Sequence, residues 1–178
     1  METHFFRRLY PFPKYGVFHV AALDLFERLQ QIEIAPAKAA DYINKFALNG
    51  AAVVKEHPNY PNLIAELETF RGCPRSSHCA FCSERLKKLT YQRPPEDIIK
   101  EVKKLSSLGN HYYRLGCQTD MLLYQHKNDN GQLKPNPAAI KELYKGITEA
   151  DPERKVLHLD NMNPADIVKY EKESREIL

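Results

Sequence analysis

Three of the four cysteines in this 178-residue chain, Cys73, Cys79 and Cys82, lie within one short stretch of the sequence. Because cysteine is scarce here, this clustering indicates that the three thiolates bind one object, and an iron–sulfur cluster is the object that the pattern favours. The spacing is C-x5-C-x2-C, which offers three thiolates where a [4Fe–4S] cluster normally has four. One iron would then be open to bind another molecule, so the pattern predicts a reactive cluster.

A zinc site is the alternative ligand assembly for this stretch. Structural zinc is held by four ligands in a tetrahedron, and a Cys-x2-Cys pair is common among them. The candidate ligands would be Cys73, His78, Cys79 and Cys82. Zinc motifs usually present two separated ligand pairs, however, and the adjacent His78 and Cys79 would have difficulty in sharing one tetrahedron. We therefore prefer the iron–sulfur cluster, with a zinc site and unliganded thiols as the alternatives.

Strand and helix patterns alternate around the cysteines. Strand-like runs occur at 63–70, 111–116 and 155–160, and amphipathic helical patterns occur at 95–108, 137–150 and 164–178. This alternation is the signature of right-handed parallel βα units. Reactive groups in such folds lie just beyond the carboxyl ends of the strands. Since the cysteines follow the first strand, their position agrees with a catalytic role.

The expected fold is α/β: a partial (βα) parallel barrel of three βα units, preceded by a mainly helical leader. A complete eight-fold barrel takes about 250 residues, and this sequence stops inside its third predicted helix. We therefore expect a fragment of a longer gene product, or a partial barrel that needs another chain. The turn at 57–61 places a boundary near residue 58. Residues 1–58 would be the leader or the remnant of a preceding domain, and 59–178 would carry the barrel units.

Three helices are predicted within the leader. The one at 20–31 has apolar residues at three-residue spacing. The one at 36–50 begins at Pro36, carries an apolar stripe at helical spacing and ends at Asn49-Gly50, a natural helix stop. A short helix at 51–56 follows.

The residues around the cysteines resemble the radical S-adenosylmethionine (SAM) superfamily. Residues 67–74, Leu-Glu-Thr-Phe-Arg-Gly-Cys-Pro, followed by Cys-Ala-Phe-Cys at 79–82, are similar to the strand and turn that open the superfamily's barrel. The resemblance covers about 60–178 and points to uncharacterised iron–sulfur oxidoreductases that also carry a C-terminal helix-hairpin-helix. The usual spacing in the superfamily is C-x3-C-x2-C, and here two further residues separate the first two cysteines.

This resemblance implies a set of cofactor ligands. Cys73, Cys79 and Cys82 would hold a [4Fe–4S] cluster, the open iron would bind the amino and carboxylate groups of SAM, and Phe81 would lie near the adenine. The turn Gly116-Cys117-Gln118 is similar in position to a Gly-Gly-Glu-like turn whose backbone carbonyls meet the SAM amino group. A glycine there permits close approach of the backbone, and an ordinary strand-to-loop turn is the alternative.

The activity that the resemblance implies is reductive cleavage of SAM to start radical chemistry on an unknown substrate. An electron donor such as flavodoxin or ferredoxin would supply the cluster. Two alternatives remain: a zinc-stabilised binding module, and a catalytically inactive fragment.

Several polar residues are further candidates for the site. The third strand alternates, which places His158 and Asp160 on the face opposite its leucines. If that face is the barrel lumen, both could act in proton transfer or substrate binding, although a histidine satisfied within the core is the commoner arrangement. Glu66 and Glu68 alternate likewise on the first strand, either toward the lumen or toward solvent.

Three polar residues follow the second strand. Cys117 is interpreted as a small buried hydrophobe in preference to a thiol facing the site, and Gln118 and Asp120 are candidate contacts for substrate or SAM. Basic residues after the cysteines could meet a phosphate-rich substrate such as RNA, but a solvated surface is favoured and no feature supports nucleic-acid binding. These are Arg85, Lys87, Lys88 and Arg93.

Composition narrows the class of protein. An apolar fraction of 43% and a charged fraction of 28% are those of an ordinary globular protein, so disorder is not indicated. No run approaches the roughly 18 apolar residues that a membrane span needs, and the first residues lack the pattern of a signal peptide. We therefore expect a cytoplasmic protein without a membrane partner, whose cysteines are metal ligands in a reducing compartment.

Overall fold

The computed structural model describes residues 36–75, 79–82 and 91–177. The chain divides into two compact units, Met1–Ala35 and Pro36–Leu178. The first unit lies outside the described residues, and so does the helix predicted at 20–31. The architecture below is that of the second unit.

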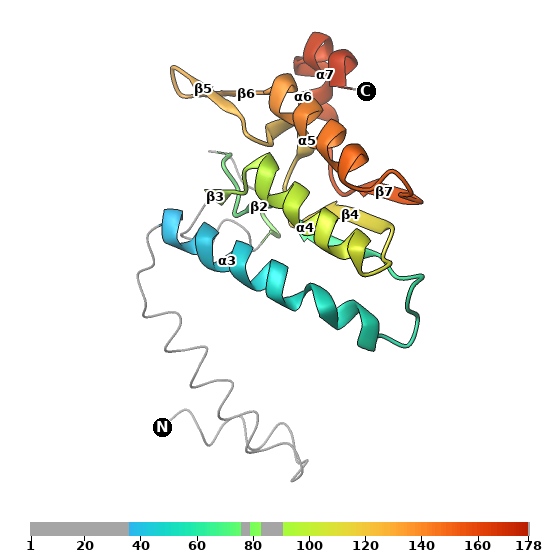
Figure 1. Ribbon diagram of the computed structural model, residues 1–178. Helices are drawn as coiled ribbons and strands as arrows, with labels where there is room; N and C mark the ends of the chain where they lie inside the picture. The colour runs from blue at the N-terminus through green and yellow to red at the C-terminus, as the bar shows by residue number, and fades with distance from the viewer. Residues whose placement is uncertain (1–35, 76–78, 83–90, 178) are drawn as a thin grey trace, which may run out of the picture. The chain divides into compact units, whose positions relative to one another are not determined.

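A parallel sheet of three strands forms the centre of this unit (Figure 1). Its strands are β1 (Ala65–Glu68), β4 (Tyr112–Gly116) and β7 (Val156–Leu159), in the order β1-β4-β7. Glu66 pairs with Arg114, and Arg114 pairs with His158, so these three residues form one row across the sheet. The α/β class and the parallel pairing are thus confirmed. The sheet has two edges and is not closed.

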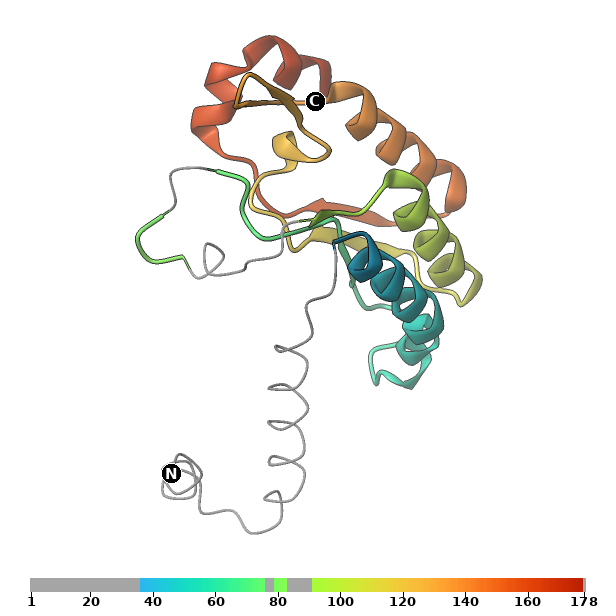
Figure 2. The same ribbon diagram turned by 90° about the vertical axis from the view of Figure 1, so that its left-hand side faces the viewer.

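Helices α4 (Pro95–Ser107) and α5 (Pro137–Ala150) connect successive strands and cover one face of the sheet (Figure 2). Their apolar stripes pack on the inward leucines and tyrosine of the strands because helix and sheet each have one apolar face to bury. Both helices match the predicted ranges. The residues that form this core are Leu67, Tyr113, Leu115, Ile98, Val102, Leu105, Ile140, Leu143 and Ile147.

Helix α3 (Pro36–Gly50) and the 3₁₀ helix η1 (Ala51–Glu56) have the bounds expected for the last two helices of the leader. Ala51 and Val54 of η1 are buried in the same hydrophobic core as the βα units. This part of the predicted leader therefore packs directly on the units that follow it.

The first predicted strand is divided at Thr69. Up to Glu68 the chain pairs with β4, but the Thr69 carbonyl accepts a hydrogen bond from the Arg93 backbone N–H at 3.0 Å. The chain then continues as β2 (Phe70–Arg71), which pairs antiparallel with β3 (Tyr91–Gln92). Strands β2 and β3 therefore form a stem that closes the base of the cysteine loop.

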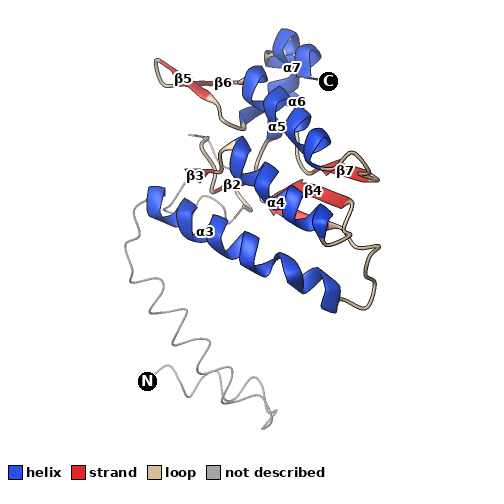
Figure 3. Ribbon diagram, in the orientation of Figure 1, coloured by secondary structure: helices blue, strands red, loops and turns tan. Residues whose placement is uncertain are grey.

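A β-hairpin lies between β4 and α5 (Figure 3). Its strands are β5 (Lys127–Asp129) and β6 (Gln132–Lys134), and their residues are mostly exposed. The turn residues Asn130 and Gly131 both have positive φ, at 50° and 80°, as a two-residue hairpin turn with right-handed strand twist requires. The Asn-Gly pair was the sequence signal for this hairpin.

The last predicted helix is divided into α6 (Pro164–Lys169) and α7 (Glu171–Ile177). A short 3₁₀ helix, η3 (Met121–Leu123), follows β4. None of the described helices is long and apolar enough to cross a lipid bilayer.

Candidate functional site

The cysteine loop leaves the sheet at the carboxyl end of β1 and returns through β3. Cys73 and Cys82 are half-buried and Cys79 is exposed, and none of the three forms a disulfide. The Cys82 backbone N–H donates to the Cys79 carbonyl at 3.2 Å, so these two cysteines share one turn. Phe81, between them, is 93% exposed. His78, the possible fourth zinc ligand, lies outside the described residues.

The thiols are not gathered around one point in this structure. Within 36–75, 79–82 and 91–177, no group of three or more His, Cys, Asp or Glu side chains is arranged to hold a metal ion. The cysteines are brought to the expected edge of the sheet, and their role as ligands stays a prediction.

Arg75, two residues after Cys73, attaches this loop to the rest of the site. Its Nη2 donates to Oδ2 of Asp120 at 2.7 Å and to Oδ2 of Asp166 at 3.0 Å. Asp120 follows β4 and Asp166 lies on α6, so one guanidinium joins the loop after β1 to the elements after β4 and β7. The side chain of Asp120 is fully buried, which makes this contact more than a solvent-screened surface pair.

Burial, and after it a hydrogen bond with Asp166, raise the pKa of Asp120 to about 6. Backbone N–H groups of Leu122 and Asn163 and the charge of Arg75 act in the opposite direction. Asp120 also begins η3, because its Oδ1 accepts from the Leu122 N–H at 3.0 Å. Asp120, expected as a substrate or SAM contact, is thus held within the fold by several polar partners.

The turn after β4 is fixed by hydrogen bonds from Thr69. The Gly116 carbonyl lies 3.2 Å from the Thr69 backbone N and 3.0 Å from its hydroxyl. Gln118 is buried, with Oε1 2.6 Å from the Thr69 hydroxyl, while its own carbonyl accepts from Asn161 Nδ2 at 3.2 Å. Two of the carbonyls expected to meet SAM therefore have partners within the protein, and their contact with SAM stays a prediction.

Cys117, the middle residue of this turn, is exposed, so the expectation that it is a small buried hydrophobe is wrong. Its φ is 56°, an uncommon value for a residue with a side chain, and its thiol lies 3.6 Å from Oε1 of Glu66. The protein partly removes the thiol from water, which raises its pKa, and the charges of Glu66 and Glu68 raise the pKa further. The result is a protonated thiol at the carboxyl edge of the sheet.

The face of the sheet opposite helices α4 and α5 is polar. Glu66, Arg114 and His158 lie on one row, and the register places Glu68 beside Gly116 on the next. Arg114 Nη2 pairs with Oδ1 of Asp160. His158 is exposed, and the leucines of β7 pack toward the core, so the predicted alternation of this strand is confirmed. His158 and Asp160 thus share the face of the sheet with Glu66.

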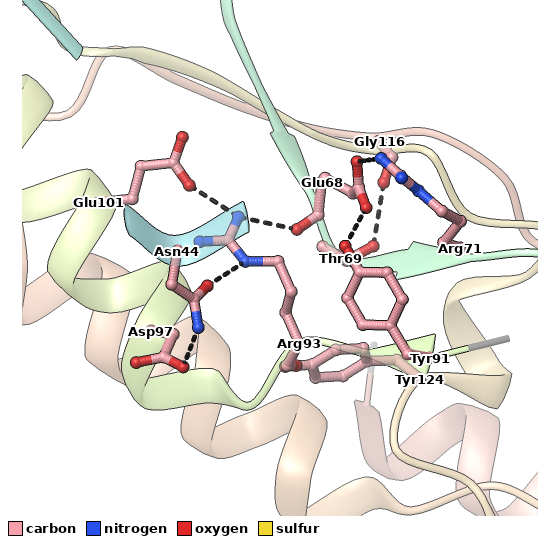
Figure 4. A network of polar contacts seen from close by, with 10 residues as sticks. All are labelled: Asn44, Glu68, Thr69, Arg71, Tyr91, Arg93, Asp97, Glu101, Gly116 and Tyr124. Carbon is pink, nitrogen blue, oxygen red and sulfur yellow. Dashed lines mark hydrogen bonds and ion pairs between the residues drawn. The ribbon is translucent and has the colours of Figure 1, made fainter. Parts of the chain in front are cut away.

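A buried arginine supports the stem of the cysteine loop (Figure 4). Arg93 is 1% exposed, and its Nη1 donates to the Glu68 carbonyl at 3.0 Å and to Glu101 at 2.7 Å. Its Nε donates to Asn44 Oδ1 at 2.9 Å, which connects α3 to the end of β1. The expectation that Arg93 belongs to a solvated basic surface is therefore wrong; the other three basic residues lie outside the described residues.

A second set of contacts holds Glu68 itself. Arg71 Nη2 donates to its Oε2 at 2.6 Å, and the Tyr91 hydroxyl donates to its Oε1 (Figure 4). Burial and this hydrogen bond raise the pKa of Tyr91. Glu68 therefore joins β1 to both strands of the stem, a role that its alternation with Glu66 did not reveal.

Comparison with known proteins finds relatives without an assigned activity. No protein-family model matches the chain. An uncharacterized protein of Methanocaldococcus jannaschii is 43% identical over 154 residues, which cover 84% of this chain and 28% of that protein. An uncharacterized protein of Archaeoglobus fulgidus is 43% identical over 136 residues, covering 76% of this chain and 25% of that protein. The chain thus spans about a quarter of the length of these relatives.

Proposed function

We propose that this chain is part of a radical SAM enzyme, in which three βα units form part of a larger (βα) barrel. One observation carries the proposal: the loop with Cys73, Cys79 and Cys82 emerges at the carboxyl end of a parallel sheet and is closed at its base by the β2–β3 stem. Reactive groups of parallel α/β folds are found at this edge.

The donor set fits an iron–sulfur cluster chemically. Three free thiols lie on one loop, and thiolates are the ligands that iron–sulfur clusters take. Cys73, Cys79 and Cys82 would hold the cluster, which would supply the electron for cleavage of the sulfonium bond of SAM. Because the sulfurs are apart in this structure, binding would draw the loop segments around 73 and 79–82 together.

The protein's own residues restrict where that loop can move. Arg75 holds its first part against Asp120 and Asp166, while Glu68 and Arg93 hold the stem. The segment with Cys79 and Phe81 remains exposed, which leaves it open to an electron donor such as flavodoxin or ferredoxin. On the open polar face, Cys117, His158 and Asp160 are the residues that would meet SAM or the substrate. We place the protein in the cytoplasm, where thiols stay reduced.

The test is metal and sulfide quantitation on anaerobically purified and reconstituted protein. We expect iron and acid-labile sulfide with the absorbance of a [4Fe–4S] cluster, and their loss in Cys79→Ala. Cys117→Ala is the matched control, since it removes an exposed thiol outside the loop and should keep the cluster. Full iron content in Cys79→Ala, or stoichiometric zinc without iron, would contradict the proposal.

SAM cleavage is tested separately. With dithionite as the reductant, we expect 5′-deoxyadenosine from the reconstituted full-length relative of Methanocaldococcus jannaschii. The same relative with the residue that aligns with Cys79 changed to alanine is the control. If the relative binds the cluster but does not cleave SAM, the radical SAM activity is excluded, while the assignment of the cluster still holds.

A further inference from the structure

Tyr91, on the stem of the cysteine loop, is a buried phenol that is hydrogen-bonded to a carboxylate. The residue is 7% exposed, and its hydroxyl donates to Oε1 of Glu68 (Figure 4). Oε2 of the same carboxylate accepts from Arg71 Nη2 at 2.6 Å, so two contacts fix its orientation. Burial, and after it the hydrogen bond to Glu68, raise the pKa of Tyr91. The phenol therefore keeps its proton at neutral pH.

This arrangement suits the loss of one electron from the phenol. A phenol that loses an electron becomes a strong acid, and its proton then moves most readily to a base that is already in contact. Oε1 of Glu68 is such a base. The guanidinium carbon of Arg71 lies 5.8 Å from the centre of the Tyr91 ring, so a ring that kept the proton would be a cation beside another cation. Transfer of the proton to Glu68 leaves the ring neutral.

The stem also places the phenol near a sulfur atom of the cysteine loop. Arg71 is the cross-strand partner of Tyr91, and Cys73 follows Arg71 by two residues. Paired residues of antiparallel strands have Cα atoms about 5.5 Å apart, and two further residues span at most about 7 Å, so the Cα atoms of Tyr91 and Cys73 lie within about 13 Å. Cys73 is half-buried and forms no disulfide.

We propose that Tyr91 is a redox-active tyrosine that reduces a thiyl radical at Cys73, with Glu68 as the acceptor of the phenol proton. One electron passes from the Tyr91 ring to the sulfur radical, which becomes a thiolate. The phenol proton moves along the hydrogen bond to Oε1 of Glu68. The products are the Cys73 thiolate, a neutral tyrosyl radical and a protonated Glu68, so electrons, protons and charge balance. The step involves neither SAM nor a cluster, and it goes beyond the proposed function.

Two other buried tyrosines differ from Tyr91 in the group that accepts their hydrogen bond or in their position. Tyr124 is 1% exposed and donates to the backbone carbonyl of Arg93 at 2.7 Å, which is a neutral group and a much weaker base than a carboxylate. Tyr113 donates to Asp151 at 2.8 Å, but it lies toward the amino end of β4, away from the cysteine loop. Tyr124 is therefore the matched control for Tyr91.

The test generates the sulfur radical at Cys73 directly. In a chain with Cys79, Cys82 and Cys117 changed to serine, Cys73 is nitrosylated, and light then splits its S–N bond into a thiyl radical and nitric oxide. Photolysis in frozen solution prevents contact between chains. We expect the electron paramagnetic resonance spectrum of a tyrosyl radical, which narrows when the protein is made with ring-deuterated tyrosine.

Variants of the tyrosines identify the electron donor. Tyr91→Phe should abolish the tyrosyl signal, and Tyr124→Phe should leave it unchanged. A signal of equal size in Tyr91→Phe, or no tyrosyl signal in the parent chain, would overturn the proposal. The hydrogen bond between Tyr91 and Glu68 would then serve only to hold the stem.

The role of Glu68 is measured by the rate of radical formation, which transient absorption follows in solution. Glutamine can accept the hydrogen bond but not the proton, so Glu68→Gln should slow the reaction about ten- to hundredfold. Glu66→Gln, the same change on the same strand, is the matched control and should leave the rate unchanged.

A second measurement needs no change at Glu68, which also holds the stem together. In the parent chain, the radical should form more slowly in D₂O than in H₂O, because a proton moves with the electron. Equal rates in the two solvents would overturn the transfer of the proton to Glu68. Neither SAM nor iron is present in these experiments, so this proposal and the radical SAM activity can fail independently.

Discussion

The guanidinium of Arg75 lies 2.7 Å from the buried carboxylate of Asp120, across 45 residues of sequence. This contact joins the cysteine loop to the carboxyl end of the neighbouring strand, and the second contact, to Asp166, extends it to α6. A loop without such contacts would have to be ordered by what it binds, and this ordering costs conformational entropy. If the loop binds a cluster as proposed, Arg75 would reduce that cost, because it already holds the start of the loop against Asp120 and Asp166.

Replacing Arg75 should therefore affect both stability and cluster retention. In Arg75→Met, Asp120 and Asp166 lose their shared cation, and we expect unfolding by urea to require about 1 to 3 kcal/mol less free energy, since one member of the pair is buried. Arg75→Lys should recover part of the loss, because lysine keeps the charge but cannot bridge two carboxylates as a planar fork. Faster release of iron to a chelator in Arg75→Met than in Arg75→Lys would show the positioning role.

Arg175→Met is the control for this change. Arg175 binds Glu171 on α7, and both side chains are exposed. Surface pairs of this kind contribute about 0.2 to 1 kcal/mol or less. If Arg175→Met destabilised the protein or accelerated iron release as much as Arg75→Met, the role of Arg75 would be no different from that of an ordinary surface charge.

Asp120 should make the stability of the protein depend on pH. Its folded pKa of about 6 lies above the value of about 3.9 for an unfolded chain, so the folded state binds the proton more tightly between those values. The resulting stabilisation is complete below about pH 4 and is lost as the pH rises through 6. The loss of stability should amount to about 1 to 2 kcal/mol, which is less than the full pKa shift implies, because the Arg75 side chain beside Asp120 is partly exposed to solvent.

Asp120→Asn should remove this dependence. Urea unfolding at about pH 4.5 and about pH 7.5 should show a smaller difference between the two conditions for the variant than for the wild type. If the free energy of unfolding changed equally with pH in the two proteins, Asp120 would not titrate in this range.

Asp151 should act in the opposite direction. Burial alone would raise the pKa of Asp151, but hydrogen bonds from His111 and Tyr113 outweigh it and the pKa is lowered. A lowered carboxyl pKa contributes stability that is present above the unfolded value and is lost as the pH falls through the folded one. Asp151→Asn should therefore destabilise the protein at neutral pH and much less in strong acid. Circular dichroism during urea titration would check this, and equal destabilisation at both pH values would contradict it.

The regular elements were predictable because their signals are local. Proline at the start of α4 and α5 and apolar residues at helical spacing gave the bounds of both helices, and short apolar runs gave the three parallel strands. The division at Thr69 was not predictable, because it depends on Arg93 donating its N–H from the far side of the cysteine loop. Periodicity in one segment carries no information about such a partner.

The polar contacts of the site were harder to predict for the same reason. Arg75 meets residues 45 and 91 positions away, and Arg93 meets Asn44 at a separation of 49. From the sequence alone, each would be taken for an ordinary surface arginine. Cys117 was expected in the core because cysteines are commonly buried, yet the backbone turn after β4 directs it to solvent.

Arg93 should be essential to the fold. Arg93→Met removes the cation that binds Glu101 and the donor that binds Oδ1 of Asn44, beside a buried strand end, and we expect a loss of about 3 kcal/mol in the free energy of unfolding. Lys100→Met, on the exposed side of α4, removes an ion pair with Asp97 and should change the free energy of unfolding by about 0.5 kcal/mol or less. Thermal unfolding of the two variants side by side would test this, and similar melting temperatures would contradict it.

Gly116→Ala should test how closely Glu66 packs over the central strand. The new Cβ would occupy the space of the Glu66 carboxylate, but that side chain is flexible and half-exposed and can turn away. We therefore expect Gly116→Ala to lower the free energy of unfolding by about 1 kcal/mol or less. Gly50→Ala, where a Cβ meets no atom within 4 Å, is the matched control and should not destabilise the protein, and urea unfolding of the two variants measures the difference. A much larger loss in Gly116→Ala would show that the Glu66 side chain cannot turn away from the central strand.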